Sequence, residues 1–121
     1  MVPGFSPSEI VIHPDVDHDY RQLEEAAKAG KKPQQAIWKR FQAAKLMIRS
    51  DGQWGDVIKK AEIPAYFREK YDVQNLYCVD LKNDVRCFYT IDSQDVVFLD
   101  IVDHDEYDKW FPPKGERKRR R

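Results

Sequence analysis

The sequence predicts an α+β domain in which an N-terminal strand and an antiparallel helical hairpin pack on a C-terminal antiparallel β-meander. Two consecutive segments carry apolar residues at spacings of three and four, the period of a helix that is buried on one side. Three short segments nearer the C-terminus are alternating or continuously apolar and are separated by turn residues, as strands are. Because the helices precede the antiparallel strands, we expect them to cover one face of the sheet.

The first strand and the first helix are predicted close to the N-terminus. Residues 9–13 form a short, mainly apolar run, and Pro14 ends it. Asp15 is the expected N-cap of the helix that follows, and Gly30 is the residue expected to end it. One face of this helix carries Val16, Tyr20, Leu23 and Ala27.

A second helix is predicted from about Pro33 to Arg49. Pro33 suits the first turn of a helix, and the short connection before it predicts an antiparallel hairpin of two helices. Its apolar stripe consists of Ile37, Phe41, Ala44 and Ile48. Three basic side chains fall off this stripe and are expected to face water: Lys39, Lys45 and Arg49. The segment from Trp54 to Tyr71 is less regular, and we expect a short helix around Gly55 to Lys60 followed by a loop.

A β-hairpin is predicted from Asn75 to Ile91. The second of its strands, Val85 to Ile91, places Arg86, Phe88 and Thr90 on one face and Cys87, Tyr89 and Ile91 on the other. Cys78 and Cys87 lie directly opposite each other if the turn has two residues, and on opposite faces if the register shifts by one. In both registers they are expected to be buried free thiols.

Residues 96–102 form a third predicted strand, apolar enough to lie inside the sheet. A short helical turn is expected from Asp103 to Phe111, and Pro112 and Pro113 stop it. Residues 1–113 are therefore predicted to form one domain. The chain contains no apolar run long enough to span a membrane, and a cytoplasmic location is expected.

The net charge of zero hides an uneven distribution. Residues 114–121 carry six basic groups and one acid, and they are expected to form a flexible basic tail that can bind RNA or an acidic partner. Residues 28–50 contain seven Lys or Arg and no acid. Residues 80–108, in contrast, contain nine acids against Lys82 and Arg86.

Residues 75–81, 85–91 and 97–109 together resemble the C-terminal half of RelE/ParE superfamily toxins. Members of that superfamily show an Arg and an aromatic residue in the middle strand, as Arg86 and Phe88 are here. The next strand is apolar and ends in His or Arg, with a Tyr a few residues later, as His104 and Tyr107 are here. The expected order of elements also matches.

The resemblance implies the toxin of a toxin–antitoxin pair, with an antitoxin protein as partner and no small-molecule cofactor. RelE-like members cleave mRNA on the ribosome by metal-independent attack of the ribose 2′-OH, and this endoribonuclease is the first hypothesis. ParE-like members share the fold but poison DNA gyrase, and a member without activity that binds an antitoxin is a further alternative.

Arg86, His104 and Tyr107 are the candidate catalytic residues. The planar guanidinium of Arg86 suits bidentate binding of phosphate, although Asp80 or Asp100 can instead pair with it. His104 is the natural proton donor or acceptor near neutral pH, and its acidic neighbours favour the charged imidazolium, which suits a general acid. Tyr107 can donate a hydrogen bond or stack on a base, or can anchor the last turn to the core.

Basic residues outside the strands are the candidates for binding RNA. They are Lys59, Lys60, Arg68 and Lys70 in the body, and Arg117 and Arg119 in the tail. The three His residues are scattered along the sequence, so no metal site is expected.

Overall fold

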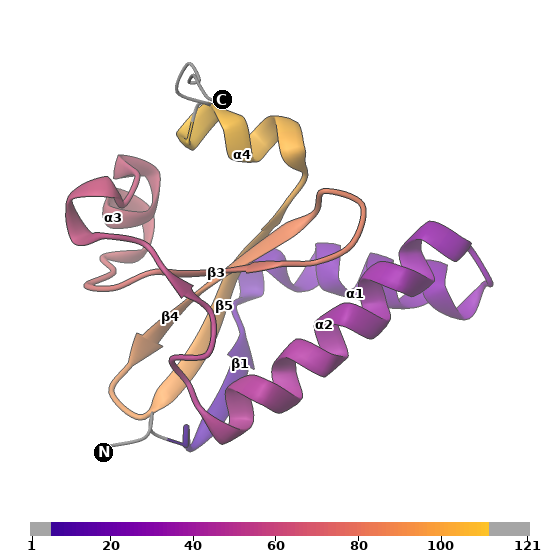
Figure 1. Ribbon diagram of the computed structural model, residues 1–121, viewed down its shortest axis with the longest axis horizontal. Coiled ribbons are helices and arrows are strands. Elements are labelled where there is room, and N and C mark those ends of the chain that lie inside the picture. Colours follow the sequence, from indigo (N-terminus) through magenta and orange to yellow (C-terminus); the bar gives the residue numbers. More distant parts are fainter. Residues whose placement is uncertain (1–5, 112–121) are drawn as a thin grey trace, which may run out of the picture.

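The structure, a computed structural model, describes residues 6–111 of the chain (Figure 1). The predicted basic tail, with Arg117 and Arg119, lies outside the described residues. Within residues 6–111, four α-helices and five strands follow one another as β1 (Glu9–Ile12), α1 (Pro14–Lys28), α2 (Lys32–Ser50), β2 (Asp56–Val57), a 3₁₀ turn (Lys60–Glu62), α3 (Ala65–Tyr71), β3 (Tyr77–Asp80), β4 (Arg86–Asp92), β5 (Asp95–Val102) and α4 (His104–Trp110). None of the helices in this part of the chain is both long and apolar enough to cross a membrane.

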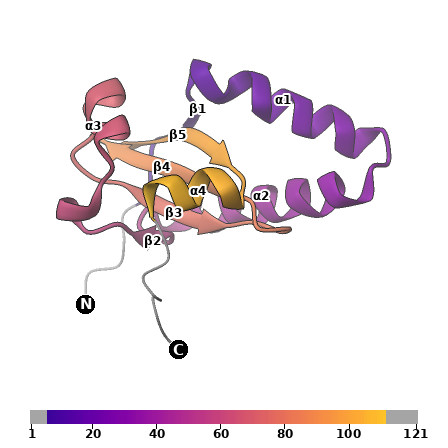
Figure 2. The same ribbon diagram turned by 90° about the horizontal axis from the view of Figure 1, so that it is seen from above.

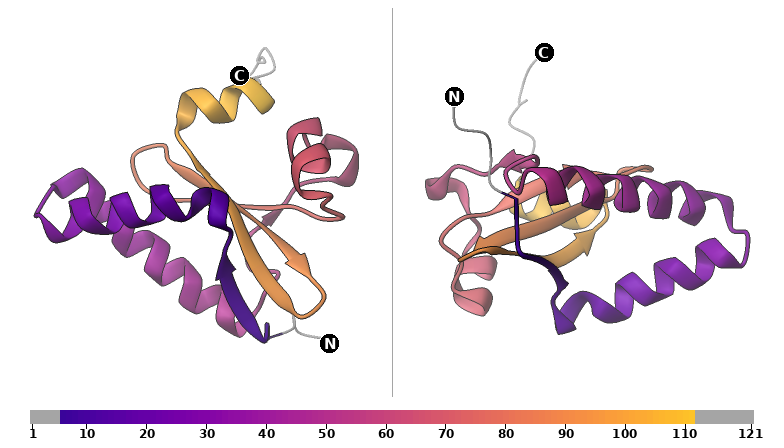
Figure 3. Two further views of the ribbon diagram at one scale, coloured as in Figure 1. Left: turned by 180° about the vertical axis from the view of Figure 1, so that it is seen from behind. Right: turned by 90° about the horizontal axis from the view of Figure 1, so that it is seen from below.

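The five strands form one mixed sheet in the order β1-β5-β4-β3-β2. β3, β4 and β5 are antiparallel neighbours, which confirms the predicted meander. β1 pairs with β5 in parallel, so the apolar β5 lies inside the sheet, as its composition predicts. The α+β class is therefore confirmed, and Figure 3 shows β1 beside β5 from behind.

The helical hairpin covers one face of the sheet. The predicted stripe of α2, together with Tyr77, Val79 and Tyr89 from the strands, forms the core of this face. Tyr20 of α1 completes it from outside, with its ring 5.3 Å from that of Phe41. The two helices are joined at the far end of the hairpin and diverge toward the sheet (Figures 2 and 3).

The other face of the sheet is covered by aromatic side chains from α3 and α4. Phe88 of β4 lies at the centre, with its ring 5.1 Å from Phe67 of α3 and 5.9 Å from Trp110 of α4. Tyr107 and Phe111 stack beside Phe88, each 6.1 Å away. This second core holds α4 close to the start of β4, and that position of α4 determines where the candidate site lies.

Two sequence predictions about helices are wrong. His13, not Asp15, caps α1: its Nδ1 accepts a hydrogen bond from the Asp15 backbone N–H at 3.0 Å, and Pro14 occupies the first turn. The helix expected around Gly55 to Lys60 is absent from the described chain, where strand β2 and the 3₁₀ turn stand instead and the helix begins after Pro64. Pro64 stands directly before the first residue of α3, and a proline at the start of a helix is a signal that the sequence already contains.

The structure has one of the two registers left open for the cysteines, and one lysine of the helical hairpin differs from expectation. Val79 pairs with Cys87, so Cys78 and Cys87 face opposite sides of the sheet, and both are buried free thiols. Burial raises the pKa of the Cys78 thiol to about 12, which keeps it protonated and unreactive. Lys45 does not simply face water, because its Nζ lies 2.8 Å from the Tyr20 hydroxyl. Lys39 and Arg49 are exposed, as predicted.

Gly55 provides a sharp test of packing on the hairpin face. The Tyr89 hydroxyl accepts a hydrogen bond from the Gly55 N–H at 2.9 Å and donates one to the Gly52 carbonyl at 2.7 Å. A Cβ at Gly55 would lie 2.9 Å from both Oη and Cε2 of Tyr89. We expect Gly55→Ala to lower the free energy of unfolding by about 2–3 kcal/mol in urea titrations. Gly30→Ala, where only the positive φ of 88° resists a side chain, should cost about 1 kcal/mol; a milder effect at Gly55 would contradict the packing.

Candidate functional site

Arg86 and Tyr107 meet where β4 begins and α4 folds back over the sheet. Arg86 pairs with Val102 at the end of β5, and α4 starts two residues later, so the helix passes close to the Arg86 side chain. The guanidinium carbon of Arg86 lies 4.2 Å from the centre of the Tyr107 ring, a cation–π contact. The structure therefore brings two of the three candidate catalytic residues into direct contact.

The Arg86 guanidinium is only partly committed to protein partners. Its Nε lies 2.8 Å from Oδ1 of Asp80, the residue directly opposite on β3. Its Nη1 is buried and has no hydrogen-bond partner among the protein atoms. The Arg86 side chain is 23% exposed and contacts both the Asp80 carboxylate and the Tyr107 ring.

His104 is the first residue of α4. Asp103 caps the helix by accepting a hydrogen bond from the Glu106 N–H at 2.9 Å. The Nε2 of His104 lies 3.0 Å from Oδ2 of Asp108, one turn further along the helix, and 55% of the His104 side chain is exposed. His104 precedes Tyr107 by three residues, about one helical turn, and the side chain that its imidazole contacts is that of Asp108.

Tyr107 is set in the site as a hydrogen-bond donor. Burial against Phe88 and Phe111 raises the pKa of its phenol, while the positive charge of Arg86 opposes that rise. The phenol is therefore neutral at physiological pH, so it can donate a hydrogen bond but does not serve as a base. The alternative role, anchoring the last helix to the core, is served by the same ring.

The four basic residues of the domain that are predicted to bind RNA lie in two different places. Lys59 and Lys60 are exposed before α3, and Arg68 of α3 donates a hydrogen bond to the Lys60 carbonyl. Lys60 and Arg68 line a small cleft together with Ile63 and residues 72–74. Lys70, in contrast, is tied into a separate polar cluster.

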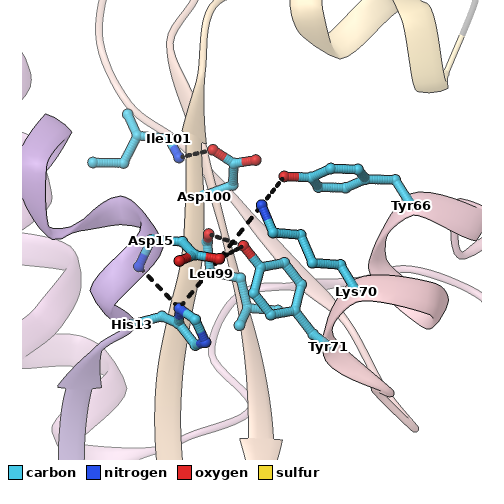
Figure 4. Close-up of polar contacts among 8 residues, drawn as sticks. All are labelled: His13, Asp15, Tyr66, Lys70, Tyr71, Leu99, Asp100 and Ile101. Carbon is cyan, nitrogen blue, oxygen red and sulfur yellow. Dashed lines mark hydrogen bonds and ion pairs between the residues drawn. The ribbon is translucent and has the colours of Figure 1, made fainter.

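The polar cluster around Lys70 contains side chains from the start of α1, the end of α3 and strand β5 (Figure 4). The Lys70 Nζ lies 3.4 Å from Asp15 Oδ2 and 3.2 Å from the Tyr66 hydroxyl. The ring of Tyr71 meets that of His13 edge-on at 4.8 Å, and its hydroxyl donates to the Leu99 carbonyl at 3.4 Å. The hydrogen bond to Tyr66 raises the pKa of Lys70, so its ammonium stays charged.

Asp100 belongs to the same region and was not recognised as a site residue from the sequence. A bulge in β5 leaves Phe88 opposite Asp100 and Tyr89 opposite Phe98. Asp100 therefore shares the face of the sheet with Phe88 and points toward α3, as Figure 4 shows. Burial raises the pKa of this carboxyl to about 6, and Lys70 opposes the rise.

The stability of the protein is expected to depend on pH through Asp100. The folded pKa of about 6 lies above the usual value of 3.8, so folding favours the protonated form. That stabilisation is complete below pH 3.8 and is lost as the pH rises through 6, at most about 2 kcal/mol for a partly exposed carboxyl. We expect Asp100→Asn to be more stable than the wild type at pH 7.5 in urea titrations, and to lose less stability between pH 4.5 and 7.5.

The exposed Glu25 on α1 supplies the matched control. Glu25→Gln removes a carboxyl that is exposed, so the variant should retain the pH dependence that is attributed to Asp100. If Asp100→Asn also retains that dependence in full, the carboxyl is not the source of it.

No group of three or more His, Cys, Asp or Glu side chains in residues 6–111 is placed to hold a metal ion. Comparison with known proteins adds no assignment, because no protein-family model, curated protein or solved structure matches the chain significantly. Its function therefore has to be argued from the site itself.

Proposed function

We propose that the chain is the toxin of a toxin–antitoxin pair and that it acts as a RelE-like, ribosome-dependent mRNA endonuclease. The observation that carries the proposal is the contact between Arg86 and Tyr107, with His104 one helical turn away. The order of elements supports it too: a strand, a helical hairpin, a meander and a short final helix occur in the order that the resemblance implies, with β2 and α3 between the hairpin and the meander.

In this proposal each residue has a role in attack by the ribose 2′-OH. The 2′-OH gives up its proton to water, the bond from O2′ to phosphorus forms, and the bond from phosphorus to O5′ breaks. Arg86 binds the phosphate and stabilises the charge that develops on it. His104 protonates the leaving O5′ as a general acid, and Tyr107 donates a hydrogen bond or stacks on a base.

One observation favours the alternative, a ParE-like toxin directed at gyrase or an inactive member that binds an antitoxin. Asp80 pairs with Arg86 and Asp108 contacts His104, so both candidate catalytic side chains already have carboxylate partners. Each carboxylate opposes the approach of a phosphate. RNA cleavage therefore requires the phosphate to displace these partners.

Inducible expression in bacteria, with and without the neighbouring gene, tests the proposal. The RelE-like reading expects rapid arrest of protein synthesis, relief by the neighbouring gene, and little early effect on DNA replication. Early arrest of replication with intact mRNA would favour the ParE-like alternative. Normal growth with abundant folded protein would leave only the inactive alternative.

A further inference from the structure

A cavity of about 440 Å³ lies on the face of the sheet that carries α3, away from the candidate catalytic residues. Phe88 packs under α3, whereas Thr90, two residues further along β4, lines this cavity together with Val97 and Leu99 of β5. Its walls come from His13, residues 70–74 and the end of β4. The volume falls in the range of small-molecule sites, roughly 300–1,000 Å³.

One wall of the cavity is built by His13 and Tyr71 (Figure 4). Their rings meet edge-on at 4.8 Å. The His13 backbone N–H donates to the Phe98 carbonyl at 2.9 Å, and the Tyr71 hydroxyl donates to the Leu99 carbonyl at 3.4 Å. The end of β1 and the end of α3 are thereby both fixed to β5, which preforms this wall.

The opposite wall is held in place by Asn75. Its Nδ2 donates to the Ile91 carbonyl at 2.9 Å, and its Oδ1 accepts from the Ile91 N–H at 2.7 Å. The Thr90 hydroxyl donates to the Asn75 carbonyl at 2.8 Å. These bonds hold the segment after α3, which begins with Asp72, beside the end of β4, which carries Asp92.

The unpaired charges of this cavity are negative. Among the described residues that line it, Lys70 is the only Lys or Arg, and its ammonium already pairs with Asp15 at 3.4 Å. Asp72 and Asp92 also line it, and neither belongs to an ion pair within residues 6–111. Two unpaired carboxylates oppose a phosphate or a carboxylate ligand and favour a cation.

We propose that this cavity binds a small aliphatic amine. The ammonium group lies against the carboxylates of Asp72 and Asp92, and the alkyl chain lies on Val97 and the Tyr71 ring. An alkylamine is charged at neutral pH, as lysine is, so it satisfies the acidic part of the lining, while its chain removes the apolar part from water. The proposal is independent of RNA cleavage, since none of the candidate catalytic residues lines the cavity.

Hexylamine is the probe, titrated into the full-length, isotope-labelled protein and followed by amide chemical shifts at pH 7. We expect a Kd of about 1 mM, with the shifts concentrated in residues 70–74, 90–92 and 97–99. Hexanol, which lacks the charge, should bind at least about fivefold more weakly. Propylamine, which has three methylenes fewer, should bind at least about tenfold more weakly.

Asp72→Asn/Asp92→Asn should weaken the binding of hexylamine at least about fivefold. Glu25→Gln/Asp56→Asn removes two exposed carboxylates that do not line the cavity, so it is the matched control and should leave binding unchanged. Circular dichroism confirms that each variant folds.

Four results would overturn the proposal. The first is no binding of hexylamine, or shifts that are spread over acidic residues outside the cavity. The second is equal weakening by the two double variants, which indicates unspecific attraction. The third is tighter binding of hexanoate than of hexylamine, which makes the cavity an anion site at Lys70. The fourth is tighter binding of N-acetyl-lysine methylamide, which makes a lysine side chain of a protein the better occupant.

Discussion

Replacing Arg86 by alanine is expected to lower the rate of mRNA cleavage in a translating extract at least about a hundredfold. The substitution removes the one strand cation that contacts Tyr107, and with it the group proposed to stabilise the charged phosphate. Arg86→Lys keeps the charge but loses the planar fork and the stacking on the ring, so an intermediate rate is expected. The measurement is the initial rate of cleavage of a defined mRNA.

Asp80→Asn is the matched variant for this prediction. The amide keeps a hydrogen-bond acceptor 2.8 Å from the Arg86 Nε but removes the carboxylate charge that competes with phosphate. We expect cleavage to be at least as fast as in the wild type. Unchanged cleavage by Arg86→Ala would exclude the guanidinium from the reaction, whatever the result for Asp80.

Phe88→Ala is expected to lower the free energy of unfolding by about 4 kcal/mol. Phe88 is fully buried at the centre of the aromatic core on the α3 and α4 face, with Phe67, Tyr107 and Trp110 around it. Its loss creates a cavity under α4, so that helix should also loosen from the sheet. Urea titration measures the first effect, and faster amide hydrogen exchange in residues 104–110 measures the second.

Phe41→Ala, on the opposite face of the sheet, is the control that distinguishes a general loss of stability from a specific loosening of α4. Phe41 is also fully buried, and its substitution should cost a similar free energy of unfolding. It packs against Tyr20 and Phe98 in the core on the helical-hairpin face of the sheet, whereas Tyr107 and Trp110 of α4 pack on the core of the other face. If hydrogen exchange in α4 rises equally in both variants, Phe88 does not anchor that helix.

The sequence predicts the parts of the fold that rest on periodicity. The stripe of α2 is buried in the structure as its spacing requires, and the strands of the meander face the two sides as their alternation requires. What the sequence does not contain is the pairing of distant segments. The parallel partner of β1 is a strand 86 residues later, and α3 is short, so its fit to the second core depends on Phe67 and Phe88 meeting in space.

The contacts of the candidate site that depend on local spacing can likewise be predicted from the sequence, whereas those between distant segments cannot. The ion pair of His104 with Asp108 follows from a spacing of four, and that of Arg86 with Asp80 follows once the hairpin register is fixed. Asp100 could not be assigned, because a bulge in β5 decides which neighbours it meets. The contact of His13 with Tyr71 joins segments that no local pattern connects.

The measurement that tests the site most directly is the chemistry of the RNA ends after incubation of mRNA with translating ribosomes and the purified protein. Attack by the 2′-OH at Arg86 and His104 predicts 2′,3′-cyclic phosphate and 5′-hydroxyl ends, which are formed by the wild type and lost in Arg86→Ala. Intact mRNA, or fragments with 5′-phosphate ends, would contradict it.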